Sequence, residues 1–317
     1  TKTDTEAILH AYEEYGADCV TKLNGMFGFA IWDSRKHRLF VARDRIGIKP
    51  MYYYCDQEQF VFGSELKSIV QVPSVPRDIE PRALDTFLTF EYIPSPYSIF
   101  RNVFKLPPGH WLMYENGQVK TQQYWHLEYQ RSSHSSVQLE QNLQELLEDA
   151  VRIRLMSDVP LGAFLSGGLD SSSIVAMMCR ASSDKVKSFS IGFDDTTYNE
   201  LPYARAVASH FGTEHFEEII TPDVASLTEK ILWMLDEPFG DFSVFPTYLV
   251  SQMARKNVTV VLSGDGGDEL LAGYDTYIAQ QVARRYAKLP ACLRKGGIEP
   301  IVNDFPPTDK KKGSIDK

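Results

Sequence analysis

Residues 166–172 read Ser-Gly-Gly-Leu-Asp-Ser-Ser, and this stretch decides the fold of the second half of the chain. The apolar run Leu-Gly-Ala-Phe-Leu at 161–165 comes directly before it, and Ser-Ile-Val-Ala-Met-Met at 173–178 follows. This order predicts a short buried strand, then a loop, then the start of a helix. Gly167 and Gly168 allow positive φ and close approach to a ligand, and N–H groups at a helix start attract anions. The stretch therefore predicts a phosphate-binding loop.

The side chains of this loop differ from those of a Walker loop, in which the second glycine is followed by Lys and then Ser or Thr. Here a phosphate would meet backbone N–H groups and the hydroxyls of Ser166, Ser171 and Ser172. Asp170 repels phosphate unless a cation lies between them. We therefore interpret Asp170 as a Mg²⁺ carboxylate, because Mg²⁺ prefers oxygen ligands and bound phosphates. The competing interpretation is a helix start with small residues and a serine cap.

The composition is that of a globular chain of about two domains, with 317 residues of which 43% are apolar. Lys and Arg number 33 against 42 Asp and Glu, which gives a formal charge of -9. No overall basic field is available to recruit nucleic acid or an anionic membrane. Any anionic substrate must be held locally.

The cysteines Cys19, Cys55, Cys179 and Cys292 are scattered and have no CxxC partner, which argues against zinc and against a disulfide framework. No apolar stretch approaches the length of a membrane span, and the first residues form no hydrophobic signal core. We expect reduced thiols and a cytoplasmic protein.

The first part of the chain reads as a helix and a mostly antiparallel sheet. A helix is expected at 4–15, and runs rich in aromatic and β-branched residues predict strands at 26–32, 39–42, 51–54 and 59–62. A proline-rich connection with a helix at 81–90 and an Asn-Gly hairpin at 110–125 follow. The polar stretch at 131–136 is the clearest linker, so we expect domains at 1–130 and 131–317.

The second part alternates strands with helices, the order typical of a doubly wound parallel sheet. After an amphipathic helix containing Leu143 and Leu147, strands are expected at 161–165, 186–191, 215–220 and 258–262, with helices at 199–211, 224–235 and 244–255. Ligands of such folds lie beyond the carboxyl ends of strands. Ser-Gly-Asp-Gly-Gly-Asp-Glu at 263–269 follows the last of these strands. Two acidic, glycine-rich strand exits predict a metal–nucleotide site.

The seven residues at 166–172 resemble the PP-loop of the ATP pyrophosphatase superfamily, whose members cleave ATP between the α and β phosphates. Three strings in the first part resemble the glutaminase domain of glutamine-hydrolysing asparagine synthetase: Leu-Asn-Gly-Met-Phe-Gly-Phe-Ala-Ile-Trp-Asp at 23–33, Arg-Asp-Arg-Ile-Gly-Ile-Lys-Pro at 43–50 and Gly-Ser-Glu-Leu-Lys at 63–67. The string at 263–269 is similar to Ser-Gly-Glu-Gly-Ala-Asp-Glu of these synthetases, with Asp265 in place of Glu. The resemblance implies part of an αββα amidotransferase sandwich followed by a doubly wound PP-loop domain.

The resemblance also implies that both ends of the family's sequence lie outside this chain. The family's nucleophilic cysteine precedes the matched region, whereas this chain starts at Thr1 and none of its four cysteines matches. We therefore expect it to be incomplete for glutaminase activity. Thr-Asp-Thr-Glu at 3–6 is similar to the family's Ser-Asp-x-Glu, which makes Asp4 a candidate ligand of the glutamine amino group. Capping of the first helix is the competing role of Asp4.

For the synthetase reaction, the resemblance implies an ATP site and a Mg²⁺ site. Adenine would lie near Leu165 and Ile191, and the phosphates would bind the loop at 166–172 with Ser263 and Gly264. Asp170 and Asp268 would hold Mg²⁺. The aspartate side chain would attack the α phosphorus to give β-aspartyl-AMP, and ammonia from glutamine would then release asparagine, AMP and pyrophosphate. Asp265 would lie near the intermediate or the amine.

Two alternatives stay open. Another PP-loop ligase, such as a β-lactam synthetase, would adenylate a different carboxylate, although the tyrosine that would favour it in place of Asp265 is absent. A chain that only binds nucleotide or a partner subunit, in a regulatory role, is the other. The expected small-molecule partners are aspartate, ATP and glutamine or ammonia, and the resemblance leaves a homodimer open.

Overall fold

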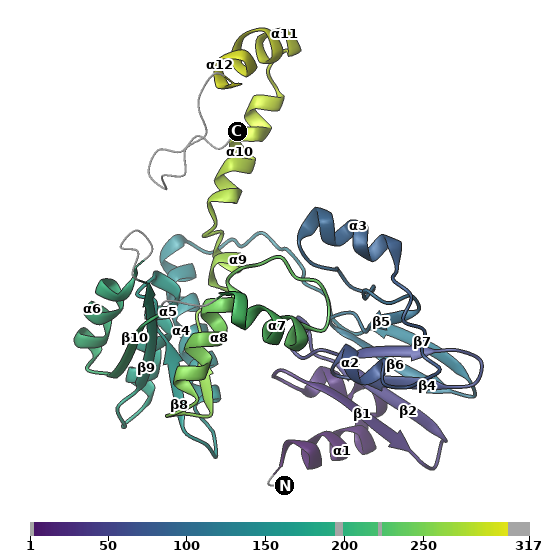
Figure 1. Cartoon of the computed structure of the whole chain (residues 1–317). Coiled ribbons are helices and arrows are strands. Elements are labelled where there is room, and N and C mark those ends of the chain that lie inside the picture. Colours follow the sequence, from purple (N-terminus) through teal and green to yellow (C-terminus); the bar gives the residue numbers. More distant parts are fainter. Residues whose placement is uncertain (1–2, 194–198, 221–223, 304–317) are drawn as a thin grey trace. The chain divides into compact units, whose positions relative to one another are not determined.

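The computed structural model describes residues 3–193, 199–220 and 224–303 (Figure 1). The chain divides into two compact units. One contains Thr1–Ser136 and Pro222–Leu249, and the other contains Val137–Thr221 and Val250–Lys317. The domain limits predicted from the sequence, 1–130 and 131–317, do not anticipate that residues 222–249 return to the first unit. A polar linker marks where the chain leaves a unit, but it carries no signal of a later return.

The first unit contains two antiparallel sheets. The four-stranded sheet has the order β1-β2-β6-β7 and the three-stranded sheet has the order β4-β3-β5. Their strands are β1 (Gly28–Asp33), β2 (Arg38–Arg43), β3 (Tyr52–Cys55), β4 (Phe60–Gly63), β5 (Val103–Lys105), β6 (His110–Glu115) and β7 (Gln118–Gln123). The helices are α1 (Asp4–Tyr15), a 3₁₀ helix (Gly16–Lys22), α2 (Leu66–Ile69), α3 (Pro81–Phe90) and, from the returning segment, α7 (Val224–Leu235).

The layers of this unit follow from alternation along the strands. In β2, Phe40 packs with Tyr12 of α1, whereas its neighbour Val41 packs with Met51 and Leu106 on the side of the second sheet. Successive side chains of a strand point to opposite faces, so one sheet is buried on both sides. The second sheet in turn packs against α2 and α3 through a further core, which includes Tyr54, Leu66, Ile69, Ala83 and Val103. The result is the predicted sandwich of helix, sheet, sheet and helix.

The second unit contains a parallel sheet of order β10-β9-β8-β11. Its strands are β8 (Leu161–Phe164), β9 (Lys187–Phe193), β10 (Glu214–Ile220) and β11 (Val260–Leu262). Its helices are α4 (Ser136–Arg154), α5 (Leu169–Ala181), α6 (Leu201–Phe211), α8 (Val244–Ala254), which begins in the first unit, α9 (Gly267–Leu271), α10 (Asp275–Ala287), α11 (Ala291–Leu293), a π-helical turn (Arg294–Ile298) and α12 (Glu299–Asn303).

Helices cover both faces of the parallel sheet, as a doubly wound fold requires (Figure 1). On one face Ala163 packs with Val151 of α4, Val175 of α5 and Ala204 of α6. On the other face Phe189 of β9 packs with Val250, Met253 and Ala254 of α8. The strand order places β8 between β9 and β11, so the connections diverge on either side of β8. This is a topological switch point, where doubly wound folds bind ligands.

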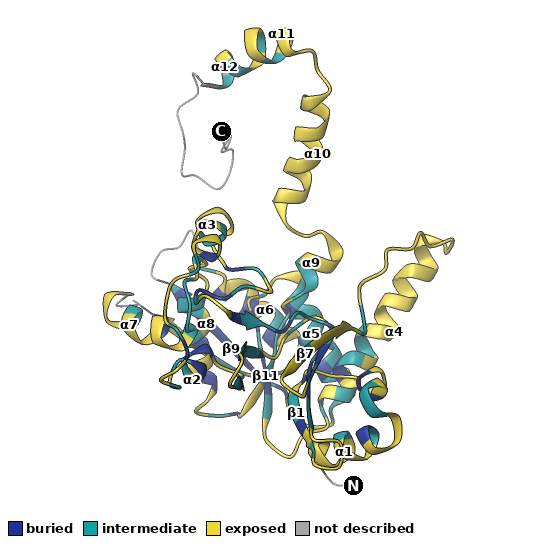
Figure 2. Ribbon diagram, turned by 90° about the vertical axis from the view of Figure 1, so that its right-hand side faces the viewer, coloured by how far each residue is buried: buried dark blue, intermediate teal, exposed yellow. Residues whose placement is uncertain are grey.

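Surface exposure differs greatly between the helices of this unit. Figure 2 shows α10 almost entirely in yellow, and none of its residues is buried. Of the residues of α4 only Val151 is buried. Within the described ranges of the chain, no helix is long and apolar enough to cross a membrane.

Candidate functional site

The first site loop leaves the carboxyl end of β8 at Leu165. The Leu165 side chain is buried, and its backbone N–H donates to the Phe189 carbonyl of β9 at 2.9 Å. The Leu165 carbonyl accepts a hydrogen bond from the buried Ser190 hydroxyl. Both main-chain groups of Leu165 are therefore held by β9, which fixes the direction in which the loop departs.

Hydrogen bonds between serines close the loop on itself. Ser166 Oγ lies 2.9 Å from Ser171 Oγ, and the Gly168 N–H donates to Ser166 Oγ at 3.2 Å. The Ser172 N–H donates to the Gly168 carbonyl at 3.0 Å, which begins the hydrogen bonding of α5. Ser172 Oγ is buried and has no hydrogen-bond partner within the described residues. A buried hydroxyl without a partner is unusual in proteins, and a phosphate oxygen at the start of α5 would supply one.

Gly167 is required by both its conformation and its surroundings. Its φ is +85°, a region that side chains with a Cβ rarely adopt. A Cβ at this position would lie 2.5 Å from the backbone N of Ala204 and 2.5 Å from the backbone C of Tyr203 in α6. The backbone of α6 therefore packs directly against the loop and leaves room for hydrogen alone.

The second site loop leaves β11 and lies against the first. β11 pairs in parallel with β8, with Leu262 opposite Ala163. A Cβ on Gly264 would lie 2.7 Å from the backbone N of Ser171, and a Cβ on Gly267 would lie 2.4 Å from the Asp170 carboxyl carbon. The two glycines let the second loop approach the start of α5 until it touches Asp170. The predicted meeting of two strand exits is present.

The acids of the second loop point in different directions. Asp265 Oδ2 accepts a hydrogen bond from Ser263 Oγ at 2.8 Å, within its own loop. Asp268 is turned toward Gly273, where an added Cβ would lie 1.9 Å from Asp268 Oδ1. Glu269 Oε1 accepts from the Tyr274 hydroxyl at 2.6 Å, and this bond lowers the pKa of Glu269 and raises the pKa of Tyr274 to about 12. Asp170 contacts the loop at Gly264 and Gly267, and Asp268 faces Gly273.

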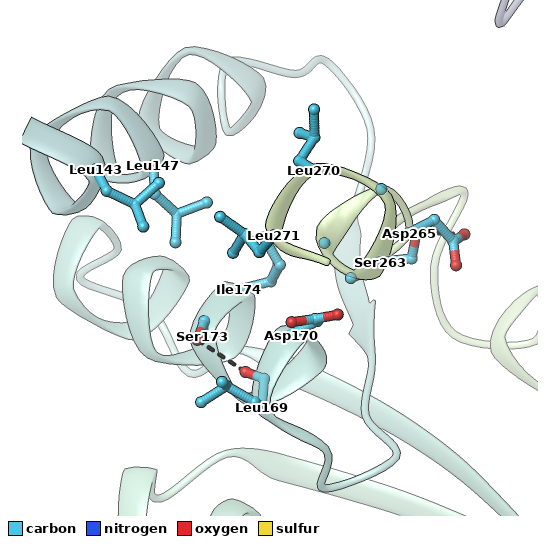
Figure 3. A pocket seen from close by; sticks show the side chains of 13 residues that line it. Leu143, Leu147, Leu169, Asp170, Ser173, Ile174, Ser263, Asp265, Leu270 and Leu271 are labelled. Atoms are coloured by element: carbon cyan, nitrogen blue, oxygen red, sulfur yellow. Dashed lines mark hydrogen bonds between the residues drawn. The ribbon is translucent and has the colours of Figure 1, made fainter. Parts of the chain in front are cut away.

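A pocket of about 340 Å³ lies between the two loops and the neighbouring helices (Figure 3). Its polar wall comes from the loops and includes Asp170, Ser263 and Asp265. Its apolar wall comes from α4, α5 and α9 and consists of Leu143, Leu147, Leu169, Ile174, Leu270 and Leu271. Figure 3 shows Leu147 and Leu271 directed toward each other, whereas the Asp265 carboxylate points away from the leucines. The pocket thus joins a polar loop surface to an apolar helix surface.

The acids of the two loops differ in their ability to hold a metal. Across residues 3–193, 199–220 and 224–303, no group of three or more His, Cys, Asp and Glu side chains is arranged as a metal site. Mg²⁺ on a nucleotide takes only one or two protein carboxylates and completes its shell with phosphates and water. Asp170 fits this requirement, because its carboxylate lies at the start of α5 and against Gly267 of the second loop. Asp268 would have to turn away from Gly273 to join it.

Two other predicted site residues are not part of the two loops. Ile191 lies in β9, opposite Glu218 of β10, and packs with the core around Phe189. Asp4 is the first residue of α1 and is exposed. Thr3 is the N-cap of this helix, and its side chain accepts from the Glu6 N–H at 3.2 Å. Asp4 instead accepts from the N–H of Thr5 at 2.7 Å. The roles of Ile191 in binding adenine and of Asp4 in binding glutamine stay predictions.

The environments of three cysteines do not favour nucleophilic chemistry. Cys19 is fully buried, and burial raises the pKa of its thiol to about 11. Burial also raises the pKa values of Cys55 and Cys179. The thiolate is the nucleophilic form, so these shifts disfavour it near neutral pH. Cys292, in the short helix α11, is exposed.

Sequence reasoning missed several features of the site. The leucines of α9 were not assigned to a pocket, and the contact of Gly267 with Asp170 was not foreseen. The signal for Leu143 and Leu147 was present, because the helical period put both on one face of the amphipathic helix predicted before the strand at 161–165. No comparable signal exists for Gly267, whose role depends on how closely the two loops approach.

Comparison with known proteins matches both parts of the chain. Residues 142–311 match the family model described as asparagine synthase, and residues 1–125 match the model described as glutamine amidotransferase domain. A Methanocaldococcus jannaschii protein named as a putative glutamine-hydrolyzing asparagine synthetase is 45% identical over 313 residues, covering 96% of this chain and 60% of that protein. The Bacillus subtilis glutamine-hydrolyzing asparagine synthetase 1 is 34% identical over 297 residues, covering 93% of this chain and 47% of that protein.

This chain therefore spans about half to three fifths of the length of these relatives. Among solved structures, an NH3-dependent NAD synthetase from Campylobacter jejuni is 20% identical with a TM-score of 0.31, covering 42% of this chain and 60% of that chain. The family model for asparagine synthase alone covers more than half of the residues, from the helix α4 through both site loops. The chain belongs to the asparagine synthase family.

Proposed function

We propose that the protein makes asparagine from aspartate, ATP and an amide nitrogen from glutamine or ammonia, through β-aspartyl-AMP. The observation that carries this proposal is the contact of Gly264 and Gly267 with the start of α5. This contact brings together the loop at 166–172, which resembles a phosphate loop without a lysine, and the acidic loop at 263–269. The two loops meet at the switch point of a doubly wound sheet. The names of the relatives and the asparagine synthase model supply the substrate class.

In this proposal the loop at 166–172 binds the pyrophosphate part of ATP through its N–H groups and the hydroxyls of Ser166 and Ser172. Asp170, joined by Asp268 once it turns from Gly273, would hold Mg²⁺, and this ion would supply positive charge to neutralise the β and γ phosphates. Leu165 and Ile191 lie toward the adenine, and Ser263 and Gly264 complete the nucleotide site. The aspartate carboxylate oxygen forms a bond to the α phosphorus as the bond to pyrophosphate breaks.

Asp265 has a different role, near the acyl-adenylate or the incoming amine. Its carboxylate lies on the loop of β11 and is exposed, apart from the leucine wall (Figure 3). Asp265→Asn is therefore expected to keep ATP binding and to lose product. Asp4 would bind the glutamine amino group in the first unit. A homodimer and a cytoplasmic location also remain predictions.

The test uses the full-length protein with aspartate, Mg²⁺-ATP and ammonia, followed by chromatography of the nucleotides. AMP that forms only when aspartate is present supports the proposal. AMP that forms only with another carboxylate would move the protein to a different PP-loop ligase. ADP would contradict the mechanism, because it reports transfer of the γ phosphate. Nucleotide binding without any turnover would favour a regulatory role.

A further inference from the structure

The turn between α7 and α8, residues 236–240, is bound by a lysine of α2. Asp236 Oδ1 lies 2.6 Å from Lys67 Nζ, and Asp236 Oδ2 accepts a hydrogen bond from the backbone N–H of Lys67 at 3.2 Å. The Asp236 side chain is 7% exposed. Glu65, the N-cap residue of α2, makes no capping hydrogen bond with its side chain. The carboxylate of Asp236 therefore holds both the main chain and the side chain of Lys67.

A second ion pair fixes the next residue of the turn. Glu237 pairs with Lys105 at the end of β5, and the two side chains are 12% and 13% exposed. Lys105 Nζ also donates to the Ile93 carbonyl at 2.6 Å. Burial raises the pKa of Glu237, and the charge of Lys105 opposes that rise. Loss of the lysine would leave a carboxylate that water reaches poorly.

The turn ends against α3. The Gly240 N–H donates to the carbonyl of Glu91 at 2.7 Å, and Glu91 is the C-cap residue of α3. A Cβ on Gly240 would lie 2.7 Å from the Cβ of Glu91, so the two backbones are in close contact. Trp233, in the last turn of α7, lies under Lys67 Nζ at 4.7 Å from the ring centroid. The turn is thus fastened to α2, β5 and α3.

These contacts connect two parts of the chain that match different family models. Lys67, Glu91 and Lys105 lie in the amidotransferase match, whereas residues 236–240 lie in the asparagine synthase match. Beyond the turn, α8 runs on to Val250 and Met253, which pack against Phe189 of the parallel sheet. At this turn, synthase sequence is therefore attached to the amidotransferase fold.

We propose that Lys67 and Lys105 are positioning residues that fasten this turn to the amidotransferase fold and thereby couple the use of glutamine to the synthesis step. The coupling rests on the proposed function. The fastening is independent of it, so the two parts can fail separately.

Hydrogen exchange tests the fastening in the 317-residue chain. Lys105→Met leaves Glu237 buried without its partner, and we expect exchange of the α7 and early α8 amides to rise by roughly a hundredfold. Lys105→Met/Glu237→Met removes both charges and should return protection close to that of the parent chain. Lys120→Met, at an exposed lysine of β7, is the control. Unchanged exchange in Lys105→Met, or equal loss in the single and double variants, would overturn the fastening.

Steady-state rates in the full-length protein test the coupling. Lys105→Met should lower glutamine-dependent asparagine formation by roughly tenfold more than ammonia-dependent formation, and the double variant should restore the ratio. An equal fall in both rates would overturn the coupling. If the parent protein makes no asparagine from ammonia, the proposed function fails, while the exchange result still decides whether the turn is fastened.

Discussion

The two site loops are held in opposite ways. The loop at 166–172 is fixed by its own hydrogen bonds and by α6, and its residue Ser171 is buried. The loop at 263–269 is more open, and Gly266 has nothing within 4 Å of an added Cβ although its φ is +97°. Its position is set where Gly264 and Gly267 touch the first loop.

We infer from this difference that the first loop sets the position of the second, through the contacts of Gly264 and Gly267. The first loop presents N–H groups in a fixed arrangement before any ligand arrives, which is what binding of a phosphate requires. The second loop carries three acids that point in different directions, and of its glycines Gly264 and Gly267 are tightly packed, whereas Gly266 is not. We infer that phosphate binding depends on the first loop and that the acids of the second adjust to the substrate.

The largest effect is expected from Gly167→Val. The branched side chain would clash with the backbone of α6, and valine would have to adopt a φ of +85°, which is strained for any residue with a Cβ. Together these effects should destabilise the second unit by about 2–5 kcal/mol. Gly266→Val is the matched control, because it carries the strain of positive φ without a clash and should cost about 1–3 kcal/mol. Thermal unfolding measures both. Equal losses would mean that the two loops are packed alike.

A smaller effect is expected from removing the acid at the contact between the loops. Asp170→Asn should weaken binding of Mg²⁺-ATP by roughly a hundredfold, because a charged ligand is replaced by a neutral one. Asp268→Asn should weaken it by only about tenfold, since Asp268 starts turned toward Gly273. Calorimetric titration measures both affinities. If neither variant differs from the parent, the metal assignment is wrong.

The smallest effect is expected from Gly267→Ala, which probes the contact itself. The new methyl group would lie 2.4 Å from the Asp170 carboxyl carbon, so the side chain must move. Because the end of the Asp170 side chain can move, we expect a loss of only about 1 kcal/mol in stability and slightly weaker Mg²⁺-ATP binding, with the first loop intact. A variant that binds Mg²⁺-ATP like the parent would show that the contact with the first loop does not set the position of the second loop.

Features that are encoded locally could be predicted from the sequence. The helix at 81–90 has a proline at its first position, and the apolar period at 224–235 defines α7, so both were predicted with the limits observed. The strand, loop and helix around residues 166–172 followed from the glycines and the apolar flanking runs, whereas phosphate binding by this loop stays a prediction. The alternation of strands and helices predicted the doubly wound sheet, and the many strands of the first part predicted the sandwich.

Features that depend on long-range approach could not be predicted. The pairing of Asp236 with Lys67 joins residues 169 positions apart, and neither residue has a neighbour that signals it. The orientation of Asp268 depends on the backbone of Gly273, which turns back onto the loop through a hydrogen bond from its N–H to the Asp268 carbonyl. The acidic string predicted the kind of residue at the site but not where each carboxylate points.

The central claim is that a substrate carboxylate attacks the α phosphorus of ATP, and oxygen tracing tests it most directly. The full-length protein is supplied with Mg²⁺-ATP, ammonia and aspartate labelled with ¹⁸O in the side-chain carboxylate. In the proposed mechanism the attacking oxygen stays with phosphorus when ammonia displaces AMP, so mass spectrometry should find one ¹⁸O in each AMP. AMP without ¹⁸O, or ADP as the product, would contradict this mechanism.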